Sequence, residues 1–210
     1  MSTLIVTAHP DEDSLTHVVA RRLAEQLGAE VHEVAHLAQE GFDPRFTLED
    51  RSRYRGTGEQ PVSVTHEQER LDRVTDVVLV FPVYWWSMPA LLKGWIDRVF
   101  VAGWAFDHDD DGRLVRKLQR LTMHLVPISG SDEESFARHG YRTSFATQIE
   151  AGIIGFCGIA QGVTAFVHDS ESTDVHAIDA EVRAATGQVA TAILHRPSSL
   201  TGLSTPASAE

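Results

Sequence analysis

Short apolar runs alternate with longer amphipathic segments along the chain. Five runs rich in β-branched and other apolar residues are expected to form strands, at residues 3–8, 31–34, 77–83, 121–128 and 162–167. Because these runs contain few alternating polar positions, they are typical of strands buried on both faces, as in a parallel sheet. The pattern therefore predicts a sheet that other elements cover on both sides.

The segments between these runs place apolar residues at helical spacing. In residues 14–27, for example, Leu15, Val19 and Leu23 fall on one face. Helices are expected at residues 14–27, 64–74, 88–100 and 180–194. Strand and helix alternate about five times, which predicts an α/β fold with a doubly wound parallel sheet. Such sheets bind ligands beyond the carboxyl ends of their strands, so residues that follow each strand are the first candidates for chemistry.

Two segments do not fit this alternation. Residues 38–61 are polar and rich in Arg and Gly. They are too long for a plain connection, which predicts a functional or partly ordered loop. Residues 196–210 form a Ser-, Thr- and Pro-rich stretch that is expected to be a flexible tail unless it docks on a partner. We therefore expect a single domain over residues 1–195, followed by this tail.

Charge and cysteine content narrow the class of protein. The chain has 30 Asp and Glu against 18 Lys and Arg, a formal net charge of -12. This balance argues against binding nucleic acid or anionic lipid, because both need a basic surface. The single cysteine, Cys157, excludes an internal disulfide, and its apolar surroundings predict a buried residue rather than a nucleophile. The first residues lack the basic region of a signal peptide and are too short an apolar run to span a membrane, so a cytoplasmic protein without membrane insertion is expected.

The segment after the first predicted strand combines donor side chains with a helix start. His9 follows the strand, and Ser14 and Thr16 lie at the beginning of the next helix. Free backbone N–H groups at a helix N-terminus attract anions, so these residues predict a phosphate site. The residues alone also allow a simpler interpretation, in which Ser14 only caps the helix and His9 only ends the strand.

Residues 8–13 (AHPDED) permit a rival interpretation as a metal site. They resemble the zinc motif of the N-acetylglucosaminyl-phosphatidylinositol de-N-acetylase-like family, in which His9 and an acid would bind zinc and Asp11 would act as the base. The acids are in a different order here. The later His-rich ligand motif of that family has no clear match, because His108 and His124 stand alone.

Aromatic residues are concentrated in one stretch of the chain. Residues 81–106 contain all four tryptophans and eight of the sixteen aromatic residues. Trp95 and Phe100 lie at helical spacing and are expected in the core. Tyr84, Trp85 and Trp86 instead lie in the turn between a strand and a helix, where they suit a flat, ring-shaped ligand. Packing against a dimer partner is the alternative, and the two roles are compatible.

Two further motifs carry weaker signals. Residues 127–131 (PISGS) form a small-residue loop after the fourth strand, which lets the backbone approach a ligand. Residues 107–112 (DHDDDG) match the start of a calcium-binding loop, but its twelfth position is Leu118 rather than the required Glu. A solvated acidic loop is therefore favoured, and no metal site is predicted.

Several of these blocks occur together in one known family. LIVTAHPDEDSLTH, EQERLDRVTDVVLVFPVYWWSMPALLKGWIDRVF, GWAF, VPISGS and GIIGFCGI, in this order over residues 3–170, resemble the NAD(P)H:quinone oxidoreductase (DT-diaphorase-like) family of flavodoxin-fold flavoproteins. The resemblance implies a flavodoxin-like, five-stranded, three-layered fold. It also implies a homodimer with a flavin at the subunit interface, and it is favoured over the zinc interpretation.

The resemblance assigns cofactor contacts to three loops. It implies His9, Ser14, Leu15 and Thr16 at the flavin phosphates, Pro82, Val83, Tyr84, Trp85, Trp86 and Ser87 along the isoalloxazine ring, and Pro127, Ile128, Ser129 and Gly130 at its pyrimidine edge. Backbone N–H groups of Ser129 and Gly130 are expected to stabilise negative charge on the reduced ring. The sequence departs from the family's Thr-Thr-Gly-Gly pattern at Pro127 and Ile128, and from Phe-Asn at Leu15 and Thr16.

The family's Tyr and His pair, which offsets charge on the reduced flavin, falls near Phe136 and Arg142. Phe136 has no hydroxyl group, so the catalytic candidates are His139, Tyr141 and Arg142. FAD is favoured slightly over FMN, because residues 38–61 have the length to close over an adenine. The arginines at positions 51, 53 and 55 suit a 2′-phosphate, although an Arg-rich loop is more often only solvated.

The implied reaction is a two-step transfer. NAD(P)H passes a hydride to N5 of the flavin and leaves, and a quinone or another small aromatic acceptor then takes two electrons in the same place. Some members of the family act instead as ancillary subunits of potassium-efflux channels. This alternative would make the chain a regulatory protein that docks on a membrane protein without entering the membrane.

Overall fold

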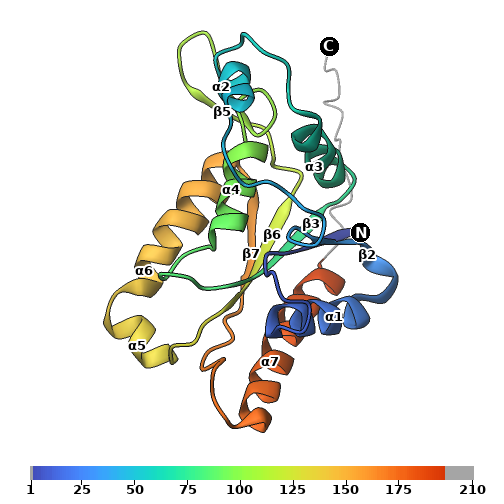
Figure 1. The fold of residues 1–210 in the computed structure, drawn as a ribbon, viewed down its shortest axis with the longest axis vertical. Coiled ribbons are helices and arrows are strands. Elements are labelled where there is room, and N and C mark those ends of the chain that lie inside the picture. Colours follow the sequence, from blue (N-terminus) through green and yellow to red (C-terminus); the bar gives the residue numbers. More distant parts are fainter. Residues whose placement is uncertain (1, 197–210) are drawn as a thin grey trace, which may run out of the picture.

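A computed structural model describes residues 2–196 of this 210-residue chain. The predicted tail at 196–210 lies outside the described residues except for Arg196. The main sheet consists of β1 (Thr3–Thr7), β2 (Val31–His36), β3 (Asp76–Pro82), β6 (Thr122–Ile128) and β7 (Ala160–Thr164). Its strands are all parallel, in the order β2-β1-β3-β6-β7 (Figure 1). Counted along the chain this is the order 2-1-3-4-5 of a flavodoxin-like sheet, so the predicted fold class is confirmed.

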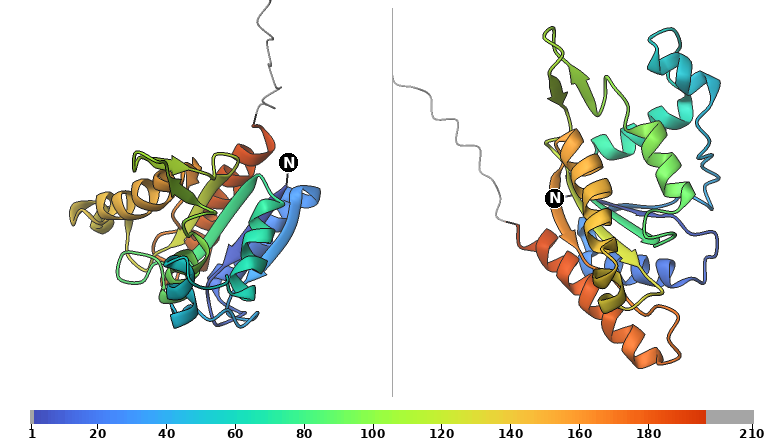
Figure 2. Two further views of the ribbon diagram at one scale, coloured as in Figure 1. Left: turned by 90° about the horizontal axis from the view of Figure 1, so that it is seen from above. Right: turned by 90° about the vertical axis from the view of Figure 1, so that its left-hand side faces the viewer.

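Helices cover both faces of this sheet. They are α1 (Leu15–Leu27), α2 (Leu48–Tyr54), α3 (Val62–Asp72), α4 (Ala90–Val99), α5 (Glu133–Arg138), α6 (Tyr141–Phe145) and α7 (Val175–Leu194), with a 3-10 turn η1 (Gly28–Glu30) and a π-helix η2 (Ala146–Gly155). α1 and α7 pack side by side on one face, whereas α3, α4 and η2 lie on the other (Figures 1 and 2). The predicted three layers are therefore confirmed.

The strands are buried on both faces because their side chains alternate between two cores. Leu4 and Val6 of β1 pack with α4, while Ile5 between them packs with α1 and α7. This alternation explains why the sequence shows continuous apolar runs and no polar face. Trp95 and Phe100 belong to the core on the α4 side, as expected.

Several predicted boundaries shift by a few residues. The fifth strand is Ala160–Thr164 rather than 162–167, and the last helix begins at Val175 rather than at residue 180. Asp174 explains the earlier start, since its carboxylate accepts hydrogen bonds from His176 N at 3.0 Å and Ala177 N at 3.1 Å and so caps the helix. Within residues 2–196, none of the helices combines the length and the apolar character needed to cross a membrane.

The long segment 38–61 is more ordered than its composition indicates. It contains α2, which begins with a reciprocal capping box between Thr47 and Asp50. Arg98 on α4 holds this segment by donating to the Asp50 carboxylate at 3.0 Å and to the Asp43 carbonyl at 2.7 Å. The segment is therefore fixed to the body of the protein at two points.

The acidic segment 107–112 forms the end of the first strand and the turn of a small hairpin. β4 (Phe106–His108) and β5 (Leu114–Arg116) pair in antiparallel fashion, and the hairpin protrudes at the same end of the molecule as α2 (Figure 1). Its aspartates are exposed, and Arg113 donates to the Asp111 carboxylate at 2.6 Å. This geometry agrees with a solvated acidic loop.

Candidate functional site

A pocket of about 220 Å³ lies at the carboxyl ends of β1, β3 and β6. The chain leaves β1 toward β2 and returns to β3 on the other side, so this is the point where the strand order reverses. The pocket is lined by His9, Ser14, Leu15, Thr16, Pro82, Val83, Tyr84, Ile128, Gly130, Ser170 and Glu171. Nine of these residues were singled out from the sequence, and the fold brings all nine together.

The start of α1 supplies backbone donors to this pocket. The N–H groups of Leu15 and Thr16, in the first turn of the helix, have no acceptor among residues 2–196, whereas those of His17 and Val18 bond to the Ser14 carbonyl. Ser14 occupies the N-cap position, yet its side chain forms no capping hydrogen bond. The helix therefore presents free N–H groups and the positive end of its dipole to the pocket, which suits an anion.

The loop before α1 is folded by its own side chains. His9 accepts a hydrogen bond from Asp11 N at 3.1 Å, and the Asp11 carboxylate accepts one from Asp13 N at 2.9 Å. Within the described part of the chain, His, Cys, Asp and Glu side chains form no group of three or more that is arranged to hold a metal ion. These contacts orient His9 toward a turn rather than toward a set of zinc ligands.

The aromatic turn after β3 has an unusual backbone. Tyr84 and Ser87 exchange two backbone hydrogen bonds, both of 3.1 Å, across Trp85 and Trp86. Both tryptophans have positive φ, 50° and 60°, as in a type I′ turn, where Asn and Gly are strongly preferred. Bulky residues in this conformation store strain of about 1–3 kcal/mol each, and such strain concentrates at functional sites. Tyr84 lines the pocket, whereas Trp85, Trp86 and Ser87 stand beyond it.

The three predicted catalytic residues are not among the residues that line the pocket. The Tyr141 ring stacks on Trp86 with centroids 4.0 Å apart, and the His139 ring lies 5.5 Å from Tyr141. The guanidinium carbon of Arg142 is 4.6 Å from the centroid of the Phe166 ring. Among the described residues, Tyr141 is therefore the member of this set that contacts the aromatic turn, and it does so from the start of α6.

The loop after β6 differs from the expectation. The N–H of Ser129 donates to the Val167 carbonyl at 2.8 Å, which extends the sheet by one bond. Its hydroxyl oxygen accepts from Ser131 N at 3.1 Å. The expectation that the Ser129 N–H faces a ligand is therefore wrong, because neighbouring backbone already uses it. Pro127 is likewise buried within β6. Ile128, the last residue of β6, and Gly130 are the predicted residues of this segment that line the pocket.

Ser170 and Glu171 complete the pocket and were missed from the sequence. They belong to the connection from β7 to α7, and Ser170 N donates to the Ser129 carbonyl at 3.0 Å. A Cβ atom at position 130 would lie 3.3 Å from the Glu171 carboxyl carbon, so Gly130 allows this close approach. The loop after every parallel strand reaches the same edge of the sheet, and this rule would have identified the segment.

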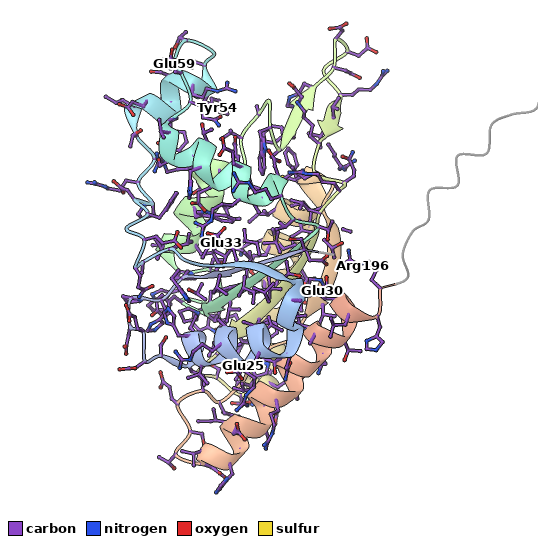
Figure 3. The ribbon with its side chains drawn as sticks, turned by 90° about the vertical axis from the view of Figure 1, so that its right-hand side faces the viewer. Glu25, Glu30, Glu33, Tyr54, Glu59 and Arg196 are labelled. Carbon is purple, nitrogen blue, oxygen red and sulfur yellow. The ribbon has the colours of Figure 1, made fainter. Side chains whose placement is uncertain are left out.

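A larger cavity of about 740 Å³ lies between the residues after β2 and α3. Its three glutamates are all paired with Arg70, which contacts Glu33 at 2.8 Å, Glu40 at 2.6 Å and Glu67 at 3.0 Å. Glu33 lies on the edge strand β2 (Figure 3). The internal pairing indicates a structural role for these charges, so the smaller pocket at the strand ends is the better candidate site.

Cys157 is not part of any candidate site. It is buried in the core, and burial raises the pKa of its thiol to about 11. A thiol with such a pKa is almost fully protonated at neutral pH and is a poor nucleophile.

Comparisons with known sequences identify relatives over most of the chain. A protein-family model with the description "Flavodoxin-like fold" matches residues 1–190. An uncharacterized NAD(P)H oxidoreductase of Escherichia coli, YcaK, is 30% identical over 167 residues, which cover 78% of this chain and 81% of that protein. The NAD(P)H dehydrogenase (quinone) 1 of Rattus norvegicus is 29% identical over 177 residues. This match covers 74% of the chain but only 64% of the rat protein, less than two thirds of its length.

Solved structures show the same fold. An NAD(P)H:quinone oxidoreductase from Methanothermobacter marburgensis superposes with a TM-score of 0.80 at 22% identity, covering 89% of this chain and 96% of that one. An FMN-dependent NADH-azoreductase from Bacillus anthracis, solved in complex with FMN, superposes with a TM-score of 0.70 at 17% identity. That match covers 92% of this chain and 99% of the azoreductase.

Proposed function

Because the chain belongs to the family with the flavodoxin-like fold, we propose that it is a flavin-dependent oxidoreductase that transfers electrons from NAD(P)H to a quinone or a similar small aromatic acceptor. The observation that carries the proposal is the convergence of the segments that follow β1, β3, β6 and β7 on one pocket at the β1/β3 switch point. In a flavodoxin-like sheet this is the place where the flavin binds.

The pocket residues fit a flavin in two respects. The free N–H groups of Leu15 and Thr16 suit its phosphate end, and the exposed aromatic turn that begins at Tyr84 suits its ring. When bound, a flavin supplies the chemistry that accepts two electrons from NAD(P)H and returns them to an acceptor.

We keep FAD as the proposed cofactor, with FMN as the alternative. Gln39 donates to the carbonyls of His9 at 3.4 Å and Pro10 at 3.2 Å. These contacts bring the beginning of the long segment 38–61 against the phosphate loop, where it has the position to cover an adenine. The FMN-containing azoreductase relative is the reason to retain FMN.

Residues around the ring would control charge and water. Positive charge on Arg142, together with donors on His139 and Tyr141, would offset negative charge that develops at the ring edge. The N–H of Gly130 has no acceptor among the described residues and would donate to the same edge. Tyr84, Trp85 and Trp86 would exclude water from the reacting face.

A second copy of the chain is part of the proposal. The pocket of about 220 Å³ is smaller than the roughly 300–1,000 Å³ typical of complete ligand sites. Two consecutive large aromatic residues of the turn are exposed, Tyr84 at 49% and Trp85 at 87%, and adjoining exposed apolar side chains mark interaction sites. A homodimer in the cytoplasm, with each site completed at the interface, would explain both features.

Steady-state kinetics test the proposed function. With flavin-loaded protein, initial rates measured at several NADH or NADPH concentrations and several benzoquinone concentrations should give parallel double-reciprocal lines, as expected for ping-pong transfer. Lines that intersect, or NAD(P)H oxidation that does not depend on flavin, would contradict the proposal. Flavin binding without any quinone turnover would favour the ancillary-subunit alternative.

A further inference from the structure

The Ser14 side chain at the start of α1 has an unexpected partner. Its hydroxyl oxygen lies 3.0 Å from Nδ1 of His17, three residues further along the chain. Ser14 lines the pocket, whereas His17 is only 3% exposed and stands behind it. The contact therefore links a buried ring to a pocket residue.

This contact replaces the ordinary capping arrangement. A serine at the N-cap normally accepts a hydrogen bond from the backbone N–H of the second or third helical residue, here Thr16 or His17. In α1 the N–H of His17 instead bonds to the Ser14 carbonyl at 3.0 Å, and the hydroxyl forms no capping bond. The N–H of Thr16 consequently remains available to a ligand.

The hydrogen-bond partners of the His17 ring indicate which of its two nitrogen atoms carries the proton. Its Nε2 atom is buried and has no hydrogen-bond partner among residues 2–196. A proton on Nε2 would therefore be a buried donor without an acceptor, and orphaned N–H groups of this kind are rarer in folded proteins than buried acceptors without a donor. With the proton on Nδ1, the ring donates to the Ser14 oxygen, and the Ser14 O–H is free to donate in turn.

A second histidine fixes the ring of His17 in place. The His36 ring lies 4.8 Å from it, and Nδ1 of His36 contacts the hydroxyl of the fully buried Thr7 at 2.8 Å. Burial, and then the neighbouring His17, lower the pKa of His36. His36 is therefore a mostly neutral packing partner at neutral pH.

We infer that His17 is a positioning residue that converts Ser14 from a helix cap into an anion donor. The pocket then offers three donors, the N–H groups of Leu15 and Thr16 and the O–H of Ser14, to a phosphate group. This inference rests on the proposed function, in which the phosphate belongs to FMN or to FAD. The shared chemistry is a phosphate ester, and riboflavin is the same ring system without it.

Ligand affinity in matched variants tests this inference. His17→Leu removes the ring donor at similar volume, His17→Asn keeps an N–H near the position of Nδ1, and Ser14→Ala removes the hydroxyl. Dissociation constants of the apoprotein for FMN, FAD and riboflavin are measured by quenching of flavin fluorescence. Because a hydrogen bond to a charged group is lost, His17→Leu should weaken FMN and FAD binding roughly tenfold. Its affinity for riboflavin should stay at the wild-type value, which also confirms that the variant is folded.

The remaining variants decide the mechanism. His17→Asn should restore most of the affinity for FMN and FAD, and Ser14→Ala should match His17→Leu. The double variant should be no weaker than Ser14→Ala alone, since both changes remove the same donor. An unchanged ratio of FMN to riboflavin affinity in His17→Leu, or losses that multiply in the double variant, would overturn the inference alone. Wild-type protein that binds none of the three flavins would overturn the proposed function and this inference with it.

Discussion

At the scale of single residues, the aromatic turn keeps two tryptophans in a strained backbone conformation. Trp85 has a φ of 50°, and its side chain is 87% exposed. The side chain therefore buries too little apolar surface to compensate for the backbone strain. Trp86 differs, because its ring gains a stacking partner in Tyr141. A strained and exposed tryptophan next to a pocket is best explained by a role in binding.

Replacing Trp85 should separate stability from activity. Trp85→Asn should raise the free energy of unfolding by about 1 kcal/mol, because Asn tolerates this turn position, and it should lower kcat/KM for the quinone. Trp85→Ala is the matched control, which removes the same ring without relieving the strain. Urea denaturation and quinone kinetics measure both effects. A Trp85→Asn protein that is less stable than Trp85→Ala would contradict this account of the turn.

The sequence predicted most residues of the pocket but not how each one is used. His9, Ser14 and Gly130 could be chosen because they follow predicted strands, and parallel strands end at one edge. The role of the Ser129 N–H could not be predicted, because its bond to Val167 depends on how far two distant strands continue to pair. The positive φ of Trp85 could not be predicted from the sequence either, because the turn contains neither Gly nor Asn, the residues typical of this conformation.

At the scale of elements, the segment 38–61 depends on a buried ion pair. Asp50 on α2 and Arg98 on α4 are 6% and 5% exposed, and their charged atoms lie 3.0 Å apart. Gly94 allows the same segment to pack closely, since a Cβ there would collide with the backbone of Pro44. The position of this polar segment is thus set by α4.

Removing the buried arginine should be costly. Arg98→Met leaves the Asp50 carboxylate buried without its partner and should lower the free energy of unfolding by about 3–5 kcal/mol. Lys93→Met on the same helix breaks the exposed pair with Asp97, 2.6 Å long, and should cost less than about 1 kcal/mol. Chemical denaturation of both variants provides the comparison. Equal losses would show that Arg98 does not anchor the segment.

Elements with strong periodicity were predictable, and irregular ones were not. The boundaries of β1 and β3 were predicted to within one residue, because the apolar runs that form these strands are continuous. The π-helix Ala146–Gly155 was not predicted, because its wider hydrogen-bond spacing has no distinct sequence pattern and it carries three glycines or alanines on exposed positions. α2 was missed because its sequence is short and polar, and the contact of Asp50 with Arg98 that holds it in place joins residues far apart in the chain.

At the scale of the whole molecule, Asp76 links the sheet to Arg196, which lies two positions after the last residue of α7. It is fully buried at the start of β3, where it contacts His124 of β6 at 3.3 Å and Arg196 after α7. Arg196 lies at the far end of the helix in Figure 3. Burial opposes ionisation, yet hydrogen bonds from His124 and Thr75 and the charge of Arg196 hold the pKa of Asp76 below its usual value.

This shift predicts how stability changes with pH. A carboxyl group whose pKa is lowered by folding stabilises the protein above its unfolded pKa and loses that contribution in acid. Asp76→Asn should therefore be less stable than wild type at neutral pH, and the difference should shrink as the pH falls below about 4. Asp97→Asn, at an exposed position, should show a small difference throughout. A constant gap between wild type and Asp76→Asn across this range would contradict the assignment.

The negative net charge of the molecule means that an anionic cofactor has to be bound by groups inside the pocket. A net charge of -12 repels an anionic cofactor at long range. Among residues 2–196, neither Lys nor Arg lines the pocket, and the acidic Glu171 does. An anion must therefore be held by helix N–H groups and hydroxyl groups at short range.

The most direct test of the central claim is the absorbance spectrum of the purified protein, followed by release and mass measurement of the bound chromophore. The account predicts a yellow protein with flavin equimolar to the chain, which NADH or NADPH bleaches in the absence of oxygen and a quinone restores. A colourless protein for which neither FMN nor FAD supports NAD(P)H oxidation would contradict it.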